Sequence, residues 1–520
     1  MAGRRAALRM ASPMLVFSCF CLLVGDMLFG YDTGSYAGTL TMPGFIGTFG
    51  DYNEATHSYA FPKLHISLMS SLAFIGKLLG CLVAAPIIER WGHRVSFYIV
   101  CAVSCIGIII EITASGTALG SGRIAQYIIG RIIVYVGVGL VEVTVTTYQA
   151  EIVPAPVRGF VILSLQLFLS VGGIIAITLT RHFATNDSQR GWKTVCGVQF
   201  VFSLLVAFFA MIIPDSPRWL LSKDRNEDAV RSLERLRSKD YAAAGSCNEE
   251  ITAIREALQE EIHKSRWIDL FRGTNLRRTM LVIVFYFFQQ CTGQAFASTY
   301  ATTFYIDYGY AANAYNYSLI NACLSLVIIP IAMFAVDQFG RRKTLLASFF
   351  LQAFWMFMLS GIGNLKNKTQ AQNSLIVASF MLYSLSYNAG GAMVPYLLGS
   401  EIPNAALREK TQALGTTWNV VWAFVSNFTI PYMITAMKFN VGWLFGSISV
   451  LALFFAFFFL PETKDRVLEE IDAIFTVPFN PFKPSRVPYT DAELRIGRLE
   501  GEKRPDDAKM ANDAVVMHAE

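Results

Sequence analysis

Long runs of apolar residues, separated by short polar segments, recur along the whole chain of 520 residues. A helix that crosses the hydrocarbon core of a bilayer needs about 20 predominantly apolar residues. Helices are the expected spanning element, because each satisfies its own backbone hydrogen bonds away from water. The pattern predicts twelve transmembrane helices, over residues 14–35, 66–88, 95–115, 124–147, 160–180, 193–213, 279–303, 317–336, 344–363, 374–399, 411–435 and 441–460.

The composition agrees with a multi-pass membrane protein. Hydrophobic residues make up 54% of the chain and charged residues only 16%, whereas soluble domains usually carry about 25% charged residues. The first apolar run is too long for the core of a signal peptide and lacks a clear small-residue cleavage site. We therefore expect this run to be a transmembrane helix.

Basic residues gather in alternate loops. Arg4, Arg5 and Arg9 precede the first run, further basic residues lie between the second and third and between the eighth and ninth runs, and the loop over 214–278 is rich in Arg and Lys. All of these segments fall on one side if both termini are cytoplasmic, as the positive-inside rule prefers. The net charge of +5 then reflects topology, so we expect a lipid bilayer as surroundings, with the plasma membrane favoured, and no nucleic-acid partner.

Three short motifs occur twice, in the same order and at offsets of 247 to 250 residues. The pairs are Glu89-Arg-Trp-Gly-His-Arg94 with Asp337-Gln-Phe-Gly-Arg-Arg342, Glu151 and Arg158 with Glu401 and Arg408, and Pro214-Asp-Ser with Pro461-Glu-Thr. Two homologous six-helix halves explain this repetition, and many secondary transporters bind substrate between such halves. We predict an all-α membrane protein with a cytoplasmic N-terminus (1–13), two six-helix bundles (14–213 and 279–461), a cytoplasmic helical linker (214–278) and a cytoplasmic tail (462–520).

The repeated motifs place acids, a glycine and basic residues at helix ends. Ion pairs between such ends would form in one state and break in another if the two halves rock, which predicts a cytoplasmic gate. Plain anchoring by the positive-inside rule is the alternative for Arg90, Arg94, Arg341 and Arg342. The predicted gate comprises Glu89, Arg90, Arg94, Glu151, Arg158, Asp337, Arg341, Arg342, Glu401 and Arg408.

Together these motifs resemble the sugar porter family of the major facilitator superfamily, over about residues 20–475. The matching segments are Gly30-Tyr-Asp-Thr-Gly34, Gly130-Arg131 with Gly137 and Gly139, Tyr148, Arg158-Gly159, Pro214-Asp-Ser-Pro-Arg-Trp-Leu220, Gln289-Gln290 with Gly293, Pro461-Glu-Thr-Lys464 and the repeated motifs above. The stretch from Gln289 to Tyr305 looks most like fungal members, with some similarity to the α-glucoside permeases. The resemblance implies the major facilitator fold and transport of a sugar.

Sugar hydroxyls donate and accept hydrogen bonds, so amide side chains, which do both, suit a sugar site. Gln289 and Gln290 lie about ten residues into the seventh run, which is roughly 15 Å deep and near the midplane. Two adjacent buried amides need partners. The resemblance implies that this pair binds the sugar, and hydrogen bonding between helices is the alternative.

The resemblance extends to four further substrate-binding positions. Gln166 in the fifth run and Asn419 in the eleventh match family sugar ligands. Gln294 stands where the family usually has Asn, and Tyr396 stands where it commonly has Trp. These departures leave the class of ligand unchanged but put its identity in doubt. Trp422 is a candidate pocket wall, with plain packing as the alternative.

Charged residues inside apolar runs are costly, by about 2.5–3.5 kcal/mol on insertion scales, and should be paired or functional. The resemblance implies that Asp32 and Arg131 are a proton-coupling carboxylate and its arginine partner; a solvated acid at the outer helix end is the alternative for Asp32. Asp26 and Glu142 lie where the family usually has uncharged residues. Each is a candidate extra proton site, or lines a wet cavity.

We therefore predict a sugar transporter, driven by proton symport, with a small-molecule sugar and a proton as its partners. Facilitated diffusion, transport of a non-sugar metabolite such as quinate, and a membrane sugar sensor remain alternatives. The chain has no nucleotide-binding glycine loop and no nucleophile–base constellation in a soluble domain. Its nine cysteines lack zinc-ligand spacing. We expect no enzymatic activity, no catalytic residues, no cofactor and no metal.

Overall fold

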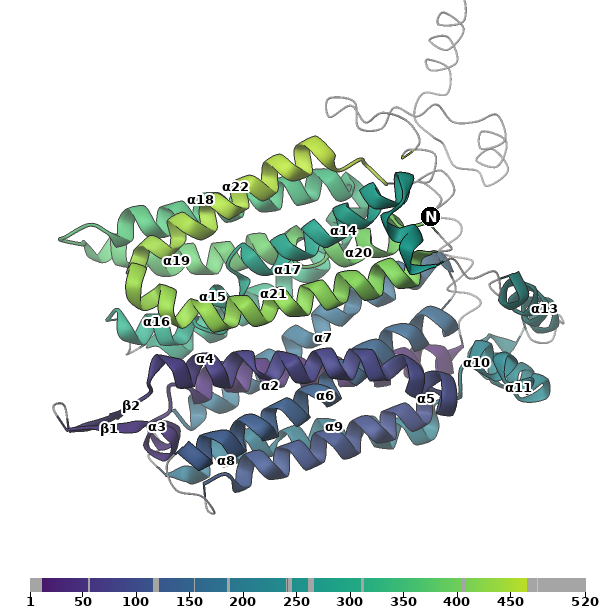
Figure 1. Cartoon of the computed structure of the whole chain (residues 1–520), viewed down its shortest axis with the longest axis horizontal. Helices are drawn as coiled ribbons and strands as arrows, with labels where there is room; N and C mark the ends of the chain where they lie inside the picture. The colour runs from purple at the N-terminus through teal and green to yellow at the C-terminus, as the bar shows by residue number, and fades with distance from the viewer. Residues whose placement is uncertain are drawn as a thin grey trace, which may run out of the picture.

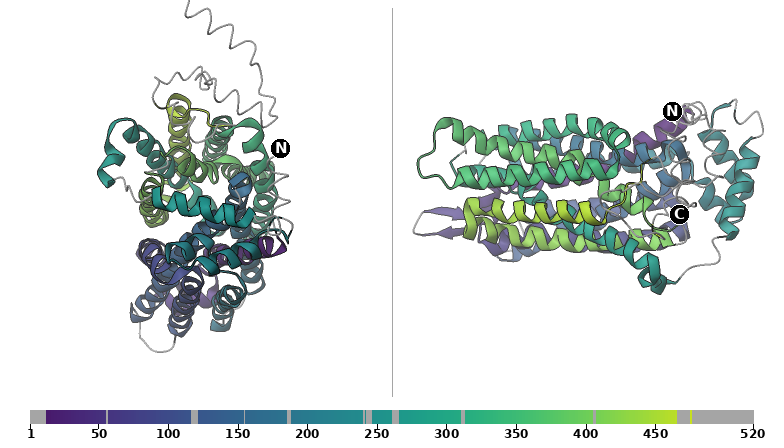
Figure 2. Two further views of the ribbon diagram at one scale, coloured as in Figure 1. Left: turned by 90° about the vertical axis from the view of Figure 1, so that its right-hand side faces the viewer. Right: turned by 90° about the horizontal axis from the view of Figure 1, so that it is seen from above.

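The computed structural model describes residues 12–464 and residue 475, except for short gaps at 55–56, 116–120, 154, 185–187, 240, 242–245, 261–265, 310–312 and 405–406. Its helices form two bundles that lie side by side with their axes roughly parallel (Figure 1). Figure 2 shows the two bundles end-on and from above. Each of the twelve predicted runs falls on helical residues in the described part of the chain.

The first bundle is built from the N-terminal helices. Gly30 of α2 lies so close to α7 that a Cβ there would meet the Leu169 carbonyl oxygen, and such small residues let membrane helices approach closely. The elements are α2 (Pro13–Thr39), α3 (Pro43–Phe49), β1 (Asp51–Asn53), β2 (Ser58–Ala60), α4 (Lys63–Ser71), α5 (Ala73–Thr113), α6 (Ser121–Ile152), α7 (Ala155–His182), α8 (Gln189–Gly197) and α9 (Gln199–Ile212).

The second bundle is built from the C-terminal helices. Its elements are η1 (Trp267–Phe271), α14 (Gly273–Cys291), α15 (Gln294–Ser298), α16 (Ala301–Asp307), α17 (Ala314–Phe339), α18 (Arg341–Gly363), α19 (Gln370–Ser386), η3 (Tyr387–Gly391), α20 (Val394–Glu401), α21 (Arg408–Met437), η5 (Lys438–Asn440) and α22 (Val441–Phe459). It meets the first bundle where α17 packs on α7, α21 on α4 and α5, and α16 on α2.

Nine helical stretches in the described residues are long and apolar enough to cross a membrane. Two of them, Lys63–Thr113 and Lys410–Phe459, each cover two of the predicted runs except for the last one or two residues. The run over 374–399 is not among them, because it is divided between shorter elements.

The seventh and the tenth predicted spans are interrupted. The seventh breaks after α14 at Gly293, whose φ of 108° is left-handed and therefore suits glycine. The tenth contains a five-residue π-helical segment, η3, between α19 and α20. Such π segments are rare and occur often at functional sites, and discontinuous helices form the substrate sites of many transporters.

The internal repeat is visible in the backbone. Gly92 and Gly340 occupy equivalent places in the two copies of the first motif, with φ of 83° and 93° and ψ of 174° and 166°. A Cβ at Gly92 would lie 3.0 Å from the Trp219 ring, and a Cβ at Gly340 would lie 2.5 Å from the Glu462 carboxylate. Both turns therefore require glycine, for conformation as well as for space.

The helices α10 (Pro217–Ser222), α11 (Asn226–Leu236) and α13 (Ser246–Glu260) lie beyond one end of the bundles (Figure 1). We call this end the linker end, and the opposite end, which carries β1 and β2, the hairpin end. Leu220, Leu233 and Ile251 help to form a small core of their own. The group docks on the first bundle, where the buried Arg237 donates to the Ile152 carbonyl at 3.0 Å.

Candidate functional site

A cavity of about 180 Å³ lies between the two bundles. The first bundle contributes α2 and α7 to its wall, and the second contributes α15, α16, α17, α19 and η3. The interrupted seventh and tenth spans therefore both reach it. Its polar wall residues are Thr33, Gln166, Ser170, Thr180, Gln294, Ser298, Thr302, Tyr305, Tyr315, Ser318, Asn321, Ser325, Tyr383, Ser384, Tyr387 and Asn388.

Two of the seven predicted substrate residues line this cavity, Gln166 from α7 and Gln294 from α15. Gln294 directly follows the left-handed Gly293, and its amide donates to the Ser298 hydroxyl at 3.2 Å. The break in the seventh span thus helps to position an amide from the second bundle in the same cavity as Gln166 from the first.

The sequence analysis missed two cavity amides, Asn321 and Asn388. The Asn321 amide donates to the Ser384 hydroxyl at 3.2 Å, while its buried carbonyl oxygen Oδ1 has no hydrogen-bond partner within the described residues. The Asn388 amide donates to the Ser325 hydroxyl at 3.2 Å. The sequence feature that could have indicated these two residues is a polar amide inside each of two apolar runs.

Gln289, Gln290 and Asn419 bond to one another outside the cavity wall. The Gln289 carbonyl accepts from the Asn419 amide at 2.7 Å, and the Asn419 carbonyl accepts from the Gln290 amide at 3.1 Å. Gln289 also donates to the Ala392 carbonyl at 2.7 Å, which joins α14 to the segment after η3. These amides satisfy one another in this conformation, and their role in sugar binding stays a prediction.

The two predicted aromatic wall residues also pack beside other rings. The Tyr396 ring lies 5.5 Å from Tyr286, and the Trp422 ring lies 4.6 Å from Phe287, both edge-to-face. Neither lines the cavity described above. Their part in a sugar site likewise stays a prediction.

Asp32 and Arg131 form a buried ion pair. Arg131 Nη2 lies 3.2 Å from Asp32 Oδ2, and the side chains are 3% and 0% exposed respectively. Gln199 of α9 donates to the other Asp32 oxygen at 3.2 Å. Asp32 therefore joins α2, α6 and α9, and its neighbour Thr33 lines the cavity.

Glu111, which the sequence analysis did not select, lies in α5 near this pair. It is fully buried, and neither of its carboxylate oxygens has a hydrogen-bond partner within the described residues. It interacts electrostatically with Asp32 and Arg131. The signal for it was an acid inside the third apolar run, which marks a functional candidate by itself.

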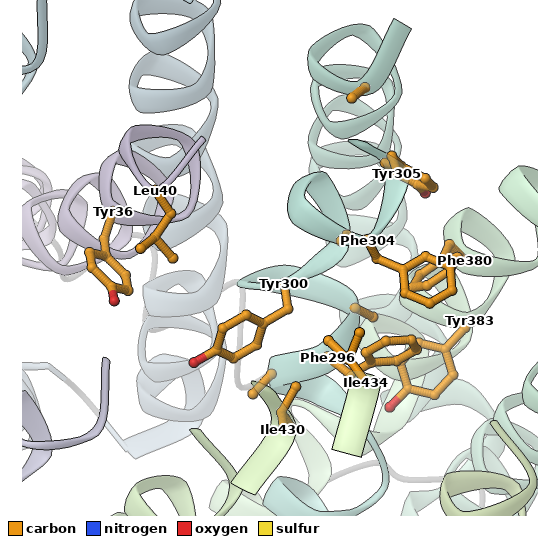
Figure 3. Packing of buried hydrophobic residues seen from close by; sticks show 14 of the residues in the cluster. Tyr36, Leu40, Phe296, Tyr300, Phe304, Tyr305, Phe380, Tyr383, Ile430 and Ile434 are labelled. Carbon is orange, nitrogen blue, oxygen red and sulfur yellow. The ribbon is translucent and has the colours of Figure 1, made fainter. Parts of the chain in front are cut away.

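The hairpin end is closed between the bundles. The Tyr300 hydroxyl donates to the Ser70 hydroxyl at 2.7 Å, and Ser70 donates to the Asn427 carbonyl at 3.3 Å. Thr41 and Tyr315 share a further hydrogen bond of 2.6 Å across the interface. Figure 3 shows Tyr300 between Tyr36 and Leu40 of α2 and the aromatic group around Phe296 and Tyr383.

The two candidate extra proton residues lie in a second group of buried charges. Glu142 forms an ion pair of 2.7 Å with Lys77, which the sequence analysis did not select. Asp26 is 3% exposed and interacts electrostatically with both residues.

The predicted gate residues of the second bundle form a network at the linker end. Arg341 holds Glu401 through two nitrogens, at 2.7 and 3.2 Å, and lies 3.9 Å from Asp337. Glu462 accepts from the backbone N–H of Arg341 at 2.9 Å and of Arg342 at 3.2 Å, so a carboxylate caps the start of α18. Arg342 also donates to the Phe457 carbonyl at 2.6 Å.

The first bundle repeats this arrangement with different residues. Arg94 lies 3.9 Å from Asp215, the counterpart of Glu462, and His93 lies 3.7 Å from Glu151, the counterpart of Glu401. Burial raises the pKa of the Asp215 carboxyl, and the Arg94 guanidinium opposes that shift. Neither of these pairs connects the two bundles.

Three further predicted gate residues interact in other ways. The Glu89 carbonyl accepts from the Trp219 indole of α10 at 3.2 Å, and the Arg90 guanidinium lies over the Trp91 ring. Arg408 begins α21 and has polar interactions. The side chain of Arg158 lies outside the described residues.

Two helical bundles with a cavity between them, a closed seal at one end and repeated charge networks at the other define a transporter of the major facilitator type. The family model described as sugar (and other) transporter matches residues 18–475. The chain belongs to this sugar transporter family. The predictions of the family, of the major facilitator fold, and of a sugar transporter as opposed to an enzyme are confirmed.

Related proteins match this chain over nearly its full length. The chain is 27% identical to the high-affinity glucose transporter ght2 of Schizosaccharomyces pombe, over 94% of this chain and 92% of that protein. It is 25% identical to the hexose transporter HXT8 of Saccharomyces cerevisiae, over 94% and 87%. A solved structure of the proton:xylose symporter XylE bound to 6-bromo-6-deoxy-D-glucose has a TM-score of 0.74, with 23% identity over 89% of this chain and 100% of that one.

Proposed function

We propose that this protein carries a hexose-class sugar across the membrane together with a proton, by alternating access of the cavity between its two bundles. The observation that carries the proposal is the position of the buried Asp32–Arg131 pair, which lies beside the cavity and beneath the closed hairpin end. Glucose and hexose in the names of the fungal relatives, and the proton in the description of XylE, support the same assignment.

The chemistry of the cavity suits a sugar. Its wall offers amides and hydroxyls that both donate and accept hydrogen bonds. The rings of Tyr305, Tyr383 and Tyr387 supply faces for apolar C–H groups. Within the described wall no residue is charged, so a neutral polyhydroxylated ligand fits better than an acid such as quinate.

The ion pair provides the coupling. In this conformation Asp32 and Arg131 are paired while the hairpin end is closed. A proton on Asp32 would remove its charge and weaken the interaction with Arg131 that joins α2 to α6, because a neutral carboxyl attracts a guanidinium far less. Protonated Asp32 thus favours opening at the hairpin end, and its deprotonation favours closure. Residues 14–213 and 279–461 would rock as two bodies joined by the linker 214–278.

The orientation follows from the basic loops. The linker end, with its many Arg and Lys residues, faces the cytoplasm, and the hairpin end faces outward. A sugar and a proton would then enter from outside, and Asp32 would release its proton toward the cytoplasm before it pairs again with Arg131. The plasma membrane is the location that this direction of transport favours.

The test is uptake of radiolabelled glucose, xylose, maltose, lactose and quinate in yeast that lacks its own sugar transporters, with and without a proton uncoupler. We expect uptake of a hexose that collapses when the uncoupler is added. Hexose uptake that the uncoupler leaves unchanged would establish facilitated diffusion instead. No uptake of any sugar, despite surface expression, would contradict the proposal and favour a sensor or a different substrate.

A further inference from the structure

A second set of charges is buried in the first bundle, one helical turn and a half away from Asp32 along α2. Its members are Asp26 of α2, Lys77 of α5 and Glu142 of α6. Lys77 Nζ lies 2.7 Å from Glu142 Oε2, with side chains 6% and 17% exposed. Lys77 also lies 4.3 Å from the centre of the Phe29 ring of α2.

Close helix packing brings these three residues together. A Cβ at Gly25, next to Asp26, would lie 2.5 Å from the side chain of Val141, next to Glu142. A Cβ at Gly139 would lie 2.2 Å from the Lys77 carbonyl oxygen. Small residues at both crossings therefore hold the three side chains in one compact group.

The charges of this group do not balance. Two carboxylates share one ammonium, and the ammonium is in direct contact with Glu142. Asp26 is 3% exposed, and its Oδ2 has no hydrogen-bond partner within the described residues. An unpaired buried charge is strongly disfavoured, and such a group neutralises itself instead.

We propose that Asp26, Lys77 and Glu142 form a second proton-binding site, in which Asp26 carries the proton while Lys77 and Glu142 remain an ion pair. The proton binds to one Asp26 carboxylate oxygen and leaves to water when the site opens. The site shares α2 and α6 with the Asp32–Arg131 pair, but Asp26 lies six residues from Asp32 along α2 and Glu142 lies eleven residues from Arg131 along α6, so the two sites are separate.

The site also faces the second bundle. Glu142 interacts electrostatically with Tyr286 of α14 and with Tyr396 of α20. Cys81 of α5 is another titratable residue that interacts with Glu142. Separation of the bundles at this place would admit water to Glu142 and Asp26. The proton would then be exchanged in the same movement that changes access to the cavity, a role that rests on the proposed function.

Infrared spectroscopy tests the site without any need for transport. The full-length protein in lipid nanodiscs would be measured at neutral pH in the Glu111→Gln background, which removes a second buried acid that lacks hydrogen-bond partners within the described residues. We expect a protonated-carboxyl carbonyl band that Asp26→Asn abolishes and Asp32→Asn leaves in place. A band that Asp26→Asn leaves unchanged, or no band at all, would overturn the proposal.

A second variant tests the site independently if Asp26→Asn fails to fold. Lys77→Met removes the only ammonium of the group, so Glu142 must also take up a proton and the band should grow about twofold. An unchanged band in a folded Lys77→Met protein would count against the site.

The coupling role is measured separately, as the number of protons that enter proteoliposomes with each glucose. We expect this ratio to fall by one in Asp26→Asn, and an unchanged ratio would exclude the coupling role. If the unaltered protein moves no protons with sugar, the proposed function fails, while the infrared result still decides whether Asp26 holds a proton.

Discussion

The guanidinium of Arg131 lies 3.9 Å from the centre of the Tyr36 ring. Through this contact one side chain touches both the Asp32 carboxylate and the aromatic cluster that joins the bundles at the hairpin end. A change in the charge of Asp32 would therefore act directly on the packing of the seal.

Asp32→Asn should separate sugar exchange from proton coupling. Asparagine keeps the shape of the side chain but neither carries the charge nor takes up a proton. We expect sugar counterflow, which needs no net proton movement, to persist, whereas accumulation against a gradient falls. Counterflow and uncoupler-sensitive accumulation would be measured in the same vesicles. Loss of both in a well-folded variant, or unchanged accumulation, would contradict the role of Asp32.

Tyr300→Phe should weaken the closure of the hairpin end. The change removes a hydroxyl that lies 2.7 Å from Ser70 Oγ and 2.9 Å from the Asn427 carbonyl oxygen. A hydrogen bond of this kind contributes about 1 kcal/mol, so the outward-open state should gain about fivefold in population. We expect a lower KM for external sugar.

Tyr308→Phe is the matched control for that prediction. The Tyr308 hydroxyl donates to the Ile434 carbonyl at 3.3 Å within the second bundle, so its loss should leave the KM unchanged. Equal effects of the two variants would show that Tyr300 has no special part in closure.

Gln166→Ala and Gln294→Ala should each weaken sugar binding. Both amides line the cavity, and loss of a hydrogen bond to a ligand costs about 1–2 kcal/mol, which corresponds to roughly a tenfold rise in KM. Gln126→Ala serves as the control, because Gln126 bonds to the Thr113 hydroxyl and the Ile110 carbonyl away from the cavity. Unchanged KM values in both cavity variants would show that these two amides do not bind the sugar and that its site lies elsewhere.

Arg341→Lys should lower the thermal stability of the protein. Lysine cannot reproduce the two-nitrogen contact of Arg341 with Glu401, since that geometry depends on the planar guanidinium. We expect a loss of about 1–2 kcal/mol, seen as a lower unfolding midpoint in detergent. Lys343→Arg, an exposed change two residues along α18, should have no such effect. Equal unfolding midpoints for the two variants would show that the Arg341–Glu401 network contributes little to stability.

Much of the fold could be predicted from the sequence, because each apolar run is long enough to define a helix by itself. The repeated motifs predicted the two bundles, and the glycine in each copy of the first motif has a positive φ in the equivalent turn. The interruptions near the cavity could not be predicted in this way. Residues 387–391 read as continuous helix, and their π-helical turn depends on tertiary contacts such as that of the Gly391 N–H with the Ser348 hydroxyl at 2.9 Å.

The candidate site was predictable only in part. The resemblance paired Asp32 with Arg131, and the structure places their side chains 3.2 Å apart. It also pointed to Gln289 and Gln290, which this conformation instead engages with Asn419. Lys77 and Glu111 were not selected, although each is a charge in an apolar run, and only the packing of α5 against α6 shows what they face. A sequence pattern gives depth in the membrane but not which neighbour a side chain meets.

The central claim is that sugar and proton move together. The most direct measurement uses purified protein in liposomes that contain a pH-sensitive dye, with no pH gradient imposed and glucose added outside. The account predicts that glucose acidifies the interior, and that Asp32→Asn reduces the signal. Glucose that enters the liposomes without acidification would contradict proton coupling and make the protein a facilitative transporter.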